Sequence, residues 1–201
     1  MYRTTARIIS WIFHPVIIPT LGFILLFHAG FYFSFLSWET RRFVLLIVFF
    51  TTAILPLLAI ALLASQPGNK LIADPGSRRS VPFIFSILFY YLGYMLLRRI
   101  DAYSVFQIFI LAAISVQIVL LMISLKWDVS SHMAALGSLL GVLLALAFRT
   151  GTNPVWAIVL VLLTSGIVGW SRLYLNRNKP WQLTAGYATG FIVLYLVIYL
   201  I

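Results

Sequence analysis

The chain has 201 residues, of which 63% are hydrophobic and 9% charged, and its mean hydropathy is +1.06. Soluble domains carry roughly 45–50% apolar and about 25% charged residues, so this chain lacks the polar side chains needed to cover a water-facing surface. Its formal charge of +10 comes from only 14 Lys and Arg residues, and it contains no cysteine. The composition indicates an integral membrane protein and excludes a soluble enzyme, a nucleic-acid-binding domain, a disulfide framework and a cysteine nucleophile.

Seven apolar runs predict membrane-spanning helices, because a spanning helix needs about 20 predominantly apolar residues. The runs are apolar all round rather than alternating, which favours helices over a β-barrel. We therefore predict an all-α, polytopic transmembrane helical bundle of six to seven spans, forming a single integral membrane domain over residues 1–201. In chain order the runs are Ile8–Leu36, Phe43–Leu63, Val81–Leu97, Ala102–Leu125, Met133–Phe148, Val155–Trp170 and Leu183–Ile201.

The first run is the least regular of the seven. His14, Pro15 and Pro19 interrupt it, and these residues predict either a kinked span or a re-entrant pair of shorter helices. A signal peptide does not fit, because the apolar stretch is broken at His14-Pro15 and no small-residue cleavage site follows.

Small residues in two of the runs predict close helix packing. Gly137, Gly141 and Ala145 share a face of the fifth run, and Gly186 and Gly190 share a face of the seventh. In lipid such faces let two backbones approach closely. The tryptophans support the boundaries of the runs, because indole side chains prefer the headgroup region at the ends of spanning helices. They are Trp11, Trp38, Trp127, Trp156, Trp170 and Trp181.

Three connections would lie on the same face of the membrane if all seven runs span it. They are residues 66–82, 126–132 and 171–182, and together they hold seven basic residues, two of the four acids and one histidine. The opposite face holds fewer charged residues: Arg41, Arg42, Arg98, Arg99, Arg149, Glu39 and Asp101.

These three connections predict an anion site. Guanidinium groups match the oxygen geometry of a phosphate, and His132 could exchange a proton with a phosphate oxygen. Ser130 and Ser131 are expected to cap the following helix, whose N-terminus also attracts anions. Basic residues in short loops and a Ser-Ser-His helix start are also compatible with topology and capping alone. The arginines of the expected site are Arg78, Arg79 and Arg172.

The same stretches resemble the three signature motifs of the type-2 phosphatidic-acid phosphatase superfamily, the lipid phosphate phosphatases that share a core with vanadium haloperoxidases. The resemblance covers about Lys70 to Gly190, with a phosphatase-like core at about residues 64–201. The opening Phe13-His14-Pro15 also resembles that of some bacterial membrane relatives. The matching stretches are Arg78-Arg79-Ser-Val-Pro82 with Lys70 upstream, Val129-Ser130-Ser131-His132, and Ser171-Arg172 running on to Thr184-Ala185-Gly186.

The resemblance implies a membrane-embedded, phosphatase-like protein of the bacterial inner membrane that needs no metal or cofactor. Its implied ligand is a lipid or polyprenyl phosphate; besides the membrane lipids, no nucleic acid and no particular protein partner is predicted. By position, His132 matches the general acid, while Asn178 and Gln182 replace the nucleophilic His and its orienting Asp. The implied phosphate-binding residues are Lys70, Arg78, Arg79, Ser130, Ser131 and Arg172.

Asn178 leaves two outcomes open, because the amide nitrogen lone pair is delocalised and cannot attack phosphorus as an imidazole does. Either the catalytic step is lost and a lipid-phosphate-binding or assembly subunit of the bacterial envelope remains, or another group replaces the nucleophile. His14 is the candidate replacement, since it lies near the start of the first run on the motif face.

The orientation in the membrane is left open by charge counting. Nine Lys and Arg lie on the motif face, with Arg3 and Arg7 included, against five on the other, which favours a cytoplasmic motif face. Without the three arginines of the expected site the count is six against five, and the family resemblance favours the outer face.

Overall fold

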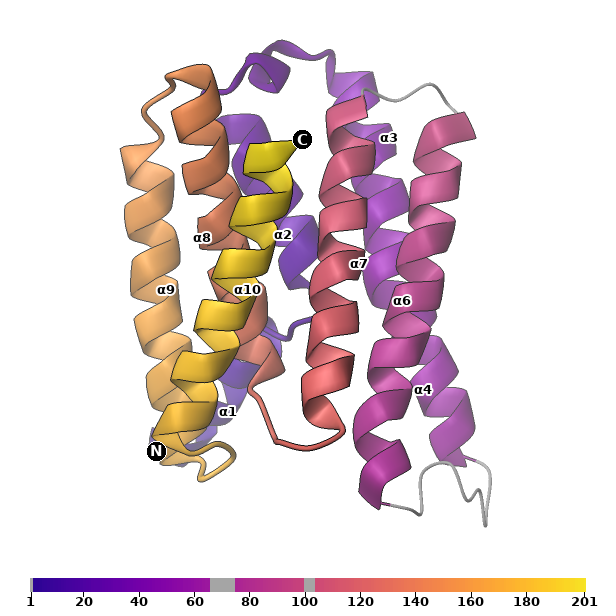
Figure 1. The fold of residues 1–201 in the computed structure, drawn as a ribbon, viewed down its shortest axis with the longest axis vertical. Helices are drawn as coiled ribbons and strands as arrows, with labels where there is room; N and C mark the ends of the chain where they lie inside the picture. The colour runs from indigo at the N-terminus through magenta and orange to yellow at the C-terminus, as the bar shows by residue number, and fades with distance from the viewer. Residues whose placement is uncertain (1, 66–74, 100–103) are drawn as a thin grey trace.

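The computed structural model describes residues 2–65, 75–99 and 104–201, with side chains described from Ser80 onward in the second range. In these residues the chain is helical and contains no strand (Figure 1). The helices are α1 (Tyr2–Ile12), α2 (Ile18–His28), η1 (Tyr32–Phe35), α3 (Trp38–Phe49), η2 (Phe50–Ile54), α4 (Leu55–Ser65), α6 (Pro75–Arg99), α7 (Ser104–Ser124), α8 (Ser131–Thr150), α9 (Val155–Tyr174) and α10 (Pro180–Leu200).

Six helical stretches in the described ranges are long and apolar enough to cross a membrane, which confirms an all-α membrane protein. One of them joins α3, η2 and α4 into a single stretch, Trp38–Ser65, and α6 contributes Ser80–Arg99. The other four are α7, α8, α9 and α10. They run side by side along one axis (Figure 1), as expected where the hydrocarbon core leaves backbone groups no partner outside their own helix.

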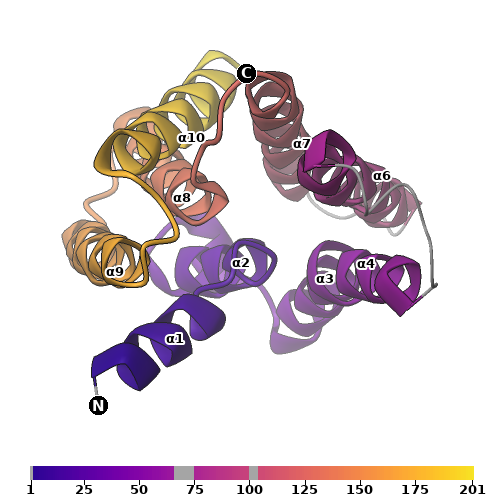
Figure 2. The same ribbon diagram turned by 90° about the horizontal axis from the view of Figure 1, so that it is seen from below.

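The first predicted run, Ile8–Leu36, is not one spanning helix, which leaves six of the predicted six to seven spans and agrees with the alternative of two shorter helices. It divides into α1 and α2, which are joined by a turn at residues 13–17, and then into the short 3₁₀ segment η1. The break falls at His14-Pro15 because proline cannot donate its backbone nitrogen to a helix and disfavours helical geometry in the residue before it. α2 then runs inside the bundle, whereas α1 lies beside α9 and extends outward at the rim (Figure 2).

A single π-helical turn, η2, lies in the middle of the second predicted span. It precedes Pro56, whose missing N–H and bulky ring disturb the regular α-helical bonding of the preceding turn. The buried Thr51 hydroxyl compensates by donating to the Ile47 carbonyl oxygen at 2.7 Å. On α6, Gly93 lets Thr51 approach, since a Cβ there would lie 2.5 Å from Thr51 Oγ1.

α8 is the central helix of the bundle. Of its best spanning window 67% is buried, against 28–39% for the other five stretches. Its glycine face meets that of α10: a Cβ on Gly141 would lie 2.6 Å from the Phe191 carbonyl oxygen, and one on Gly186 2.5 Å from that of Ser130. The predicted small-residue faces therefore pack against each other, backbone to backbone.

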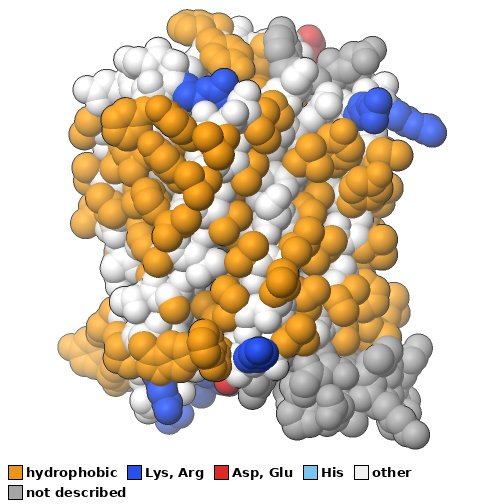
Figure 3. All heavy atoms as spheres, viewed as in Figure 1, with side chains coloured by type: hydrophobic (Ala, Val, Ile, Leu, Met, Phe, Trp, Pro, Cys, Tyr) orange, Lys and Arg blue, Asp and Glu red, His pale blue; other side chains and the backbone are white. Residues whose placement is uncertain are grey.

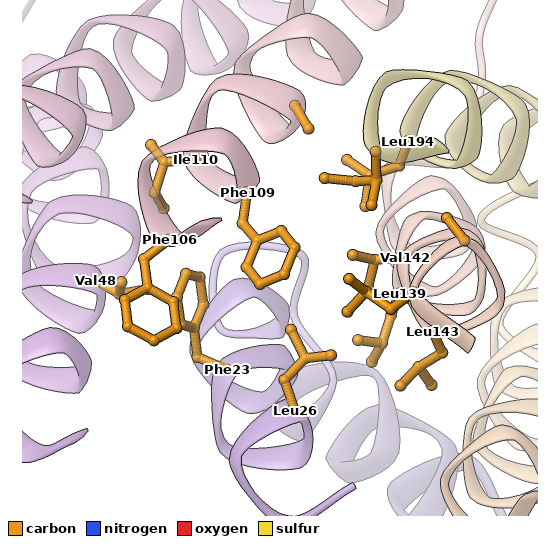
Figure 4. Close-up of a cluster of buried hydrophobic side chains, with 14 of the residues drawn as sticks. Phe23, Leu26, Val48, Phe106, Phe109, Ile110, Leu139, Val142, Leu143 and Leu194 are labelled. Carbon is orange, nitrogen blue, oxygen red and sulfur yellow. The ribbon is translucent and has the colours of Figure 1, made fainter. Parts of the chain in front are cut away.

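The apolar core is formed by buried side chains of α2, α3, α6, α7, α8 and α10. Aromatic side chains form its centre, with Phe23 of α2 lying 5.9 Å, centroid to centroid, from both Phe106 and Phe109 of α7. Figure 4 shows Phe109 on one side of this region and Leu139 and Val142 of α8 on the other. The core ties α2 to the spanning helices although α2 is too short to be counted as a span.

The outer surface has the distribution expected of a membrane protein. Hydrophobic side chains cover the middle of the face in Figure 3, and Lys and Arg side chains appear only towards its two ends. Large apolar side chains that would be buried in a soluble protein are exposed here, for example Leu163 of α9 and Ile192 of α10. The hydrocarbon of the bilayer is the solvent for these groups.

The two ends of the bundle differ in what they carry. At one end lie α1, the end of α4, the start of α6, and the connections between α7 and α8 and between α9 and α10 (Figure 1). The C-terminus, η1 and the connection between α8 and α9 lie at the other end. The three motif stretches thus start or end at the same end of the bundle, as predicted, and we call it the motif end.

Candidate functional site

α1 contributes Ser10 to the centre of the motif end. The helix is strongly amphipathic: Ala6 and Ser10, one turn apart, are buried, while Arg7 and Trp11 point outward. α1 packs against α9, which carries Arg172 in its last turn. Ser10 is therefore brought next to residues that are more than a hundred positions away in the sequence.

Arg172 is the hub of a polar network at this end. Its Nη1 donates to Ser10 Oγ at 3.2 Å and its Nε to Asn178 Oδ1 at 2.9 Å. Asn178 Nδ2 donates in turn to Gln182 Oε1 at 3.4 Å, and the same oxygen accepts from the backbone N–H of Lys179 at 2.8 Å. Fixed from two sides, the guanidinium cannot swing freely into the lipid.

His132 lies in the first turn of α8 and is buried, with only 7% of its surface exposed. Its Nε2 lies 3.2 Å from the Ser10 carbonyl oxygen and 3.5 Å from Ser10 Oγ. A carbonyl oxygen only accepts, so Nε2 carries the proton in the neutral ring and Nδ1 holds a lone pair. That Nδ1 is buried and has no hydrogen-bond partner among the described residues.

His14 is the second imidazole of the motif end. Its ring packs edge to face against the ring of His132, with the centroids 5.4 Å apart. His14 Nδ1 is also buried without a partner in the described part of the chain. Burial, with the positive charge of Arg172 adding to it, lowers the pKa of His14 below its usual value of 6.5, so that this imidazole is neutral at pH 7.

The start of α8 adds backbone donors to the site. Ser130 occupies the N-cap position as predicted, but its side chain makes no capping bond, and its buried Oγ has no partner among the described residues. Instead the Ser130 N–H donates to the Gln182 carbonyl oxygen at 3.1 Å, tying α8 to α10. The expected Ser130 cap is therefore wrong, and the first N–H groups of α8 keep their capacity for an anion.

A cavity of about 390 Å³ opens from the two imidazoles into the bundle. His14, Ser131 and His132 are among its lining residues, and most of the remaining lining consists of apolar side chains from α2, α4, α6, α7, α8 and α10. The polar side chains in that remainder are Ser86, Gln117 and Ser138. Its volume falls in the range of roughly 300–1,000 Å³ that is typical of small-molecule sites. Phe109, Leu139 and Leu194, which are labelled in Figure 4, are among its apolar lining residues.

The predicted site residues are brought together only in part. Arg172, Asn178 and Gln182 form one network, and Ser10 links Arg172 to His132. Ser130 and Ser131 begin α8 beside them. Lys70 lies outside the described residues, and Arg78 and Arg79 lie in the N-terminal part of α6, where side chains are not described.

Sequence reasoning missed Ser10 and left His14 as a bare candidate. A signal for Ser10 existed, because Ala6 and Ser10 are the small residues on one face of an otherwise bulky amphipathic helix. The contact between the two histidines could not be deduced, since they lie 118 positions apart and come together only through the break between α1 and α2.

Comparison with protein-family models, with curated proteins and with solved structures finds no match to this chain. The site geometry and the sequence motifs therefore carry the functional argument alone.

Proposed function

We propose that this protein is a phosphatase-like membrane protein that recognises a lipid or polyprenyl phosphate, in a bacterial inner membrane. The single observation that carries the proposal is the juxtaposition of a held arginine and a buried histidine with the mouth of an apolar cavity. Arg172 and His132 share Ser10 as a partner, and His132 lines the cavity that runs into the bundle.

The headgroup chemistry follows from the donors at the motif end. Arg172 offers a guanidinium, which matches phosphate oxygens better than an ammonium does. Ser10 accepts hydrogen bonds from Arg172 through its hydroxyl and from His132 through its carbonyl oxygen. A bound phosphate would replace Ser10 as the acceptor of these hydrogen bonds. The uncapped start of α8 adds N–H groups and the positive end of a helix dipole.

The lipid part of the ligand would occupy the cavity. Its walls are mostly aliphatic and aromatic, and each methylene moved from water into such surroundings contributes about 0.8 kcal/mol. A small water-soluble phosphate would gain nothing from them. An apolar chamber whose lining residue His132 is joined to Arg172 through Ser10 thus favours an amphiphile over a free metabolite.

Hydrolysis of the phosphomonoester or diphosphate is the activity that the motif resemblance implies, with His132 protonating the leaving oxygen. A specific observation favours a second candidate, an inactive lipid-phosphate-binding or assembly subunit. The amide of Asn178 stands at the nucleophile position, and both its oxygen and its nitrogen are engaged by Arg172 and Gln182.

The test uses the purified full-length protein in detergent micelles with a chelator present. Release of inorganic phosphate from dioctanoyl phosphatidic acid and from farnesyl phosphate is measured alongside binding by calorimetry. A hydrolase releases phosphate and loses this activity in His132→Ala. A binder shows affinity without release, and that affinity falls in Arg172→Ala but not in the control Arg177→Ala, which alters an exposed arginine of the same connection. If the unmodified protein neither binds these lipids nor releases phosphate from them, the proposal is refuted.

A further inference from the structure

Two imidazoles, rather than one, border the mouth of the cavity. His14 and His132 come from different elements, their centroids lie 5.4 Å apart, and both line the same chamber. Each ring has an Nδ1 that is buried and without a partner in the described residues. Buried polar atoms are almost always hydrogen-bonded, so two orphaned nitrogens on rings that line one cavity point to a ligand.

The spacing of the two rings suits one tetrahedral anion. Phosphate oxygens lie about 2.5 Å apart, and a hydrogen bond to each from a ring nitrogen adds about 2.8 Å on either side. One phosphate group can therefore contact both rings. The conformation at His14 is set locally, since its carbonyl oxygen accepts from the Ile17 N–H at 2.9 Å and Pro15 follows it.

Resting on the proposed function, we infer that His14 is a second headgroup-binding residue, which acts with His132 and Arg172 to select a phosphomonoester dianion over a phosphodiester. A phosphomonoester presents three terminal oxygens to these three side chains, whereas a phosphodiester presents only two. The second negative charge also favours protonation of an imidazole, which turns a lone pair into a donor aimed at the anion.

Proton uptake on binding is the measurable consequence. Facing His14 are His132 of α8 and Arg172 of α9, and the backbone of α1 ends beside it. Because burial and Arg172 hold the pKa of free His14 low, the ring is neutral before binding, and a dianion placed between the imidazole and Arg172 raises that pKa. Binding then takes up protons, and affinity rises as the pH falls towards the pKa of the free ring.

The first experiment uses the unmodified protein, with histidine rings labelled with ¹⁵N and the chain in detergent micelles. The chain has three histidines, and His28 lies at the other end of α2, where its Nδ1 bonds the Ile24 carbonyl oxygen, so it serves as an internal control. The probe is decylphosphonate, in which carbon replaces the bridging oxygen and prevents hydrolysis. Two ring signals should shift and that of His28 should not; a shift confined to one ring would overturn the inference.

The second experiment compares decylphosphonate with its monomethyl ester by calorimetry in two buffers of different ionisation enthalpy. The unmodified protein should prefer the dianion at least tenfold, and His14→Gln should lose about tenfold in affinity for it. His14→Gln should also take up fewer protons on binding than the unmodified protein. Ionisation of the probe contributes equally to both measurements, so it cancels in this difference. His28→Gln should match the unmodified chain.

The outcomes separate the two proposals. If the unmodified protein binds neither probe, the proposed function fails. If decylphosphonate binds, and Arg172→Gln weakens it while His14→Gln changes neither affinity, preference nor proton uptake, then His14 is no ligand and the proposed function stands.

Discussion

The contact between α8 and α10 gives the sharpest stability prediction, because backbone rather than side chain fills the space beside its glycines. In Gly190→Ala the added Cβ would overlap the Ala134 carbonyl oxygen and lie 2.8 Å from Ser138 Oγ. Relief has to come from separation of the helices. The overlap at Gly141 is smaller than that at Gly190, and even there extending 2.6 Å to an ordinary 3.4 Å means a displacement of about 0.8 Å.

Overpacking costs about 1–3 kcal/mol, and a backbone obstacle that no side-chain rotation relieves belongs to the upper part of this range, about 2–3 kcal/mol. Alanine recovers about 1 kcal/mol of this through its helix propensity. The matched control is Gly166→Ala in α9, where a Cβ meets nothing within 4 Å and only the propensity gain remains. We expect Gly190→Ala to unfold in SDS with a free energy about 1–2 kcal/mol lower, and Gly166→Ala with one equal or higher. Equal effects of the two variants would refute backbone contact between α8 and α10.

Three further predictions concern the ends of the bundle. Arg149→Gln should lower the free energy of unfolding by about 0.5–1 kcal/mol in the same assay, because the exposed Arg149 side chain donates from Nη1 to the Ile198 carbonyl oxygen at 2.8 Å. The control Arg98→Gln, which is also at an exposed position, should not lower it. Acidification from pH 8 to 5 should lower the melting temperature. The folded protein disfavours protonated His14 beside Arg172, so stability is lost as the pH falls below about 6.5. The dependence of the melting temperature on pH should be flatter in His14→Gln. Reporter fusions at the two termini should place them on opposite faces of the membrane. If both reporters are active on the same face, the arrangement in Figure 1 is contradicted.

The spanning helices were predictable because their signal is local. An apolar run of about 20 residues specifies a helix in lipid whatever its neighbours are, and six of the seven predicted runs correspond to such helices. The glycine faces were predictable for the same reason, since their spacing alone indicates a surface for close approach. What these patterns did not specify was the pairing of the two faces, which depends on how α8 and α10 meet in space.

The first run shows where composition misleads. Its length and hydropathy resemble those of a span, yet His14-Pro15 and the polar face of α1 divide it. The amphipathic pattern of Tyr2–Ile12 was visible in the sequence, but it was overshadowed by the apolar stretch that follows. Because α1 and the turn after it lie at the motif end, the divided run is the one that delivers Ser10 and His14.

The polar site was predictable as far as motif spacing reaches. Arg172, Asn178 and Gln182 lie within ten residues of each other, around a turn and a helix start, so their proximity follows from local geometry. The link from Arg172 to His132 runs through Ser10, a residue that no motif contains. Such a long-range contact depends on the complete packing of α1 against α9.

The Asn178→His variant tests whether the site is a complete pocket lacking only a nucleophile. An imidazole that attacks phosphorus must donate its one N–H and keep the lone pair of the other nitrogen free. At this position Gln182 Oε1, which accepts from Asn178 Nδ2 at 3.4 Å, can accept that N–H. We expect phosphate release from dioctanoyl phosphatidic acid to rise at least tenfold, and to depend on His132 in the double variant with His132→Ala. Arg177→His places an imidazole at an exposed position of the same connection and should give no gain. If Asn178→His binds the lipid as well as the unmodified protein and still releases no additional phosphate, position 178 does not face the phosphorus atom, and the phosphatase-like arrangement of the motif end is refuted.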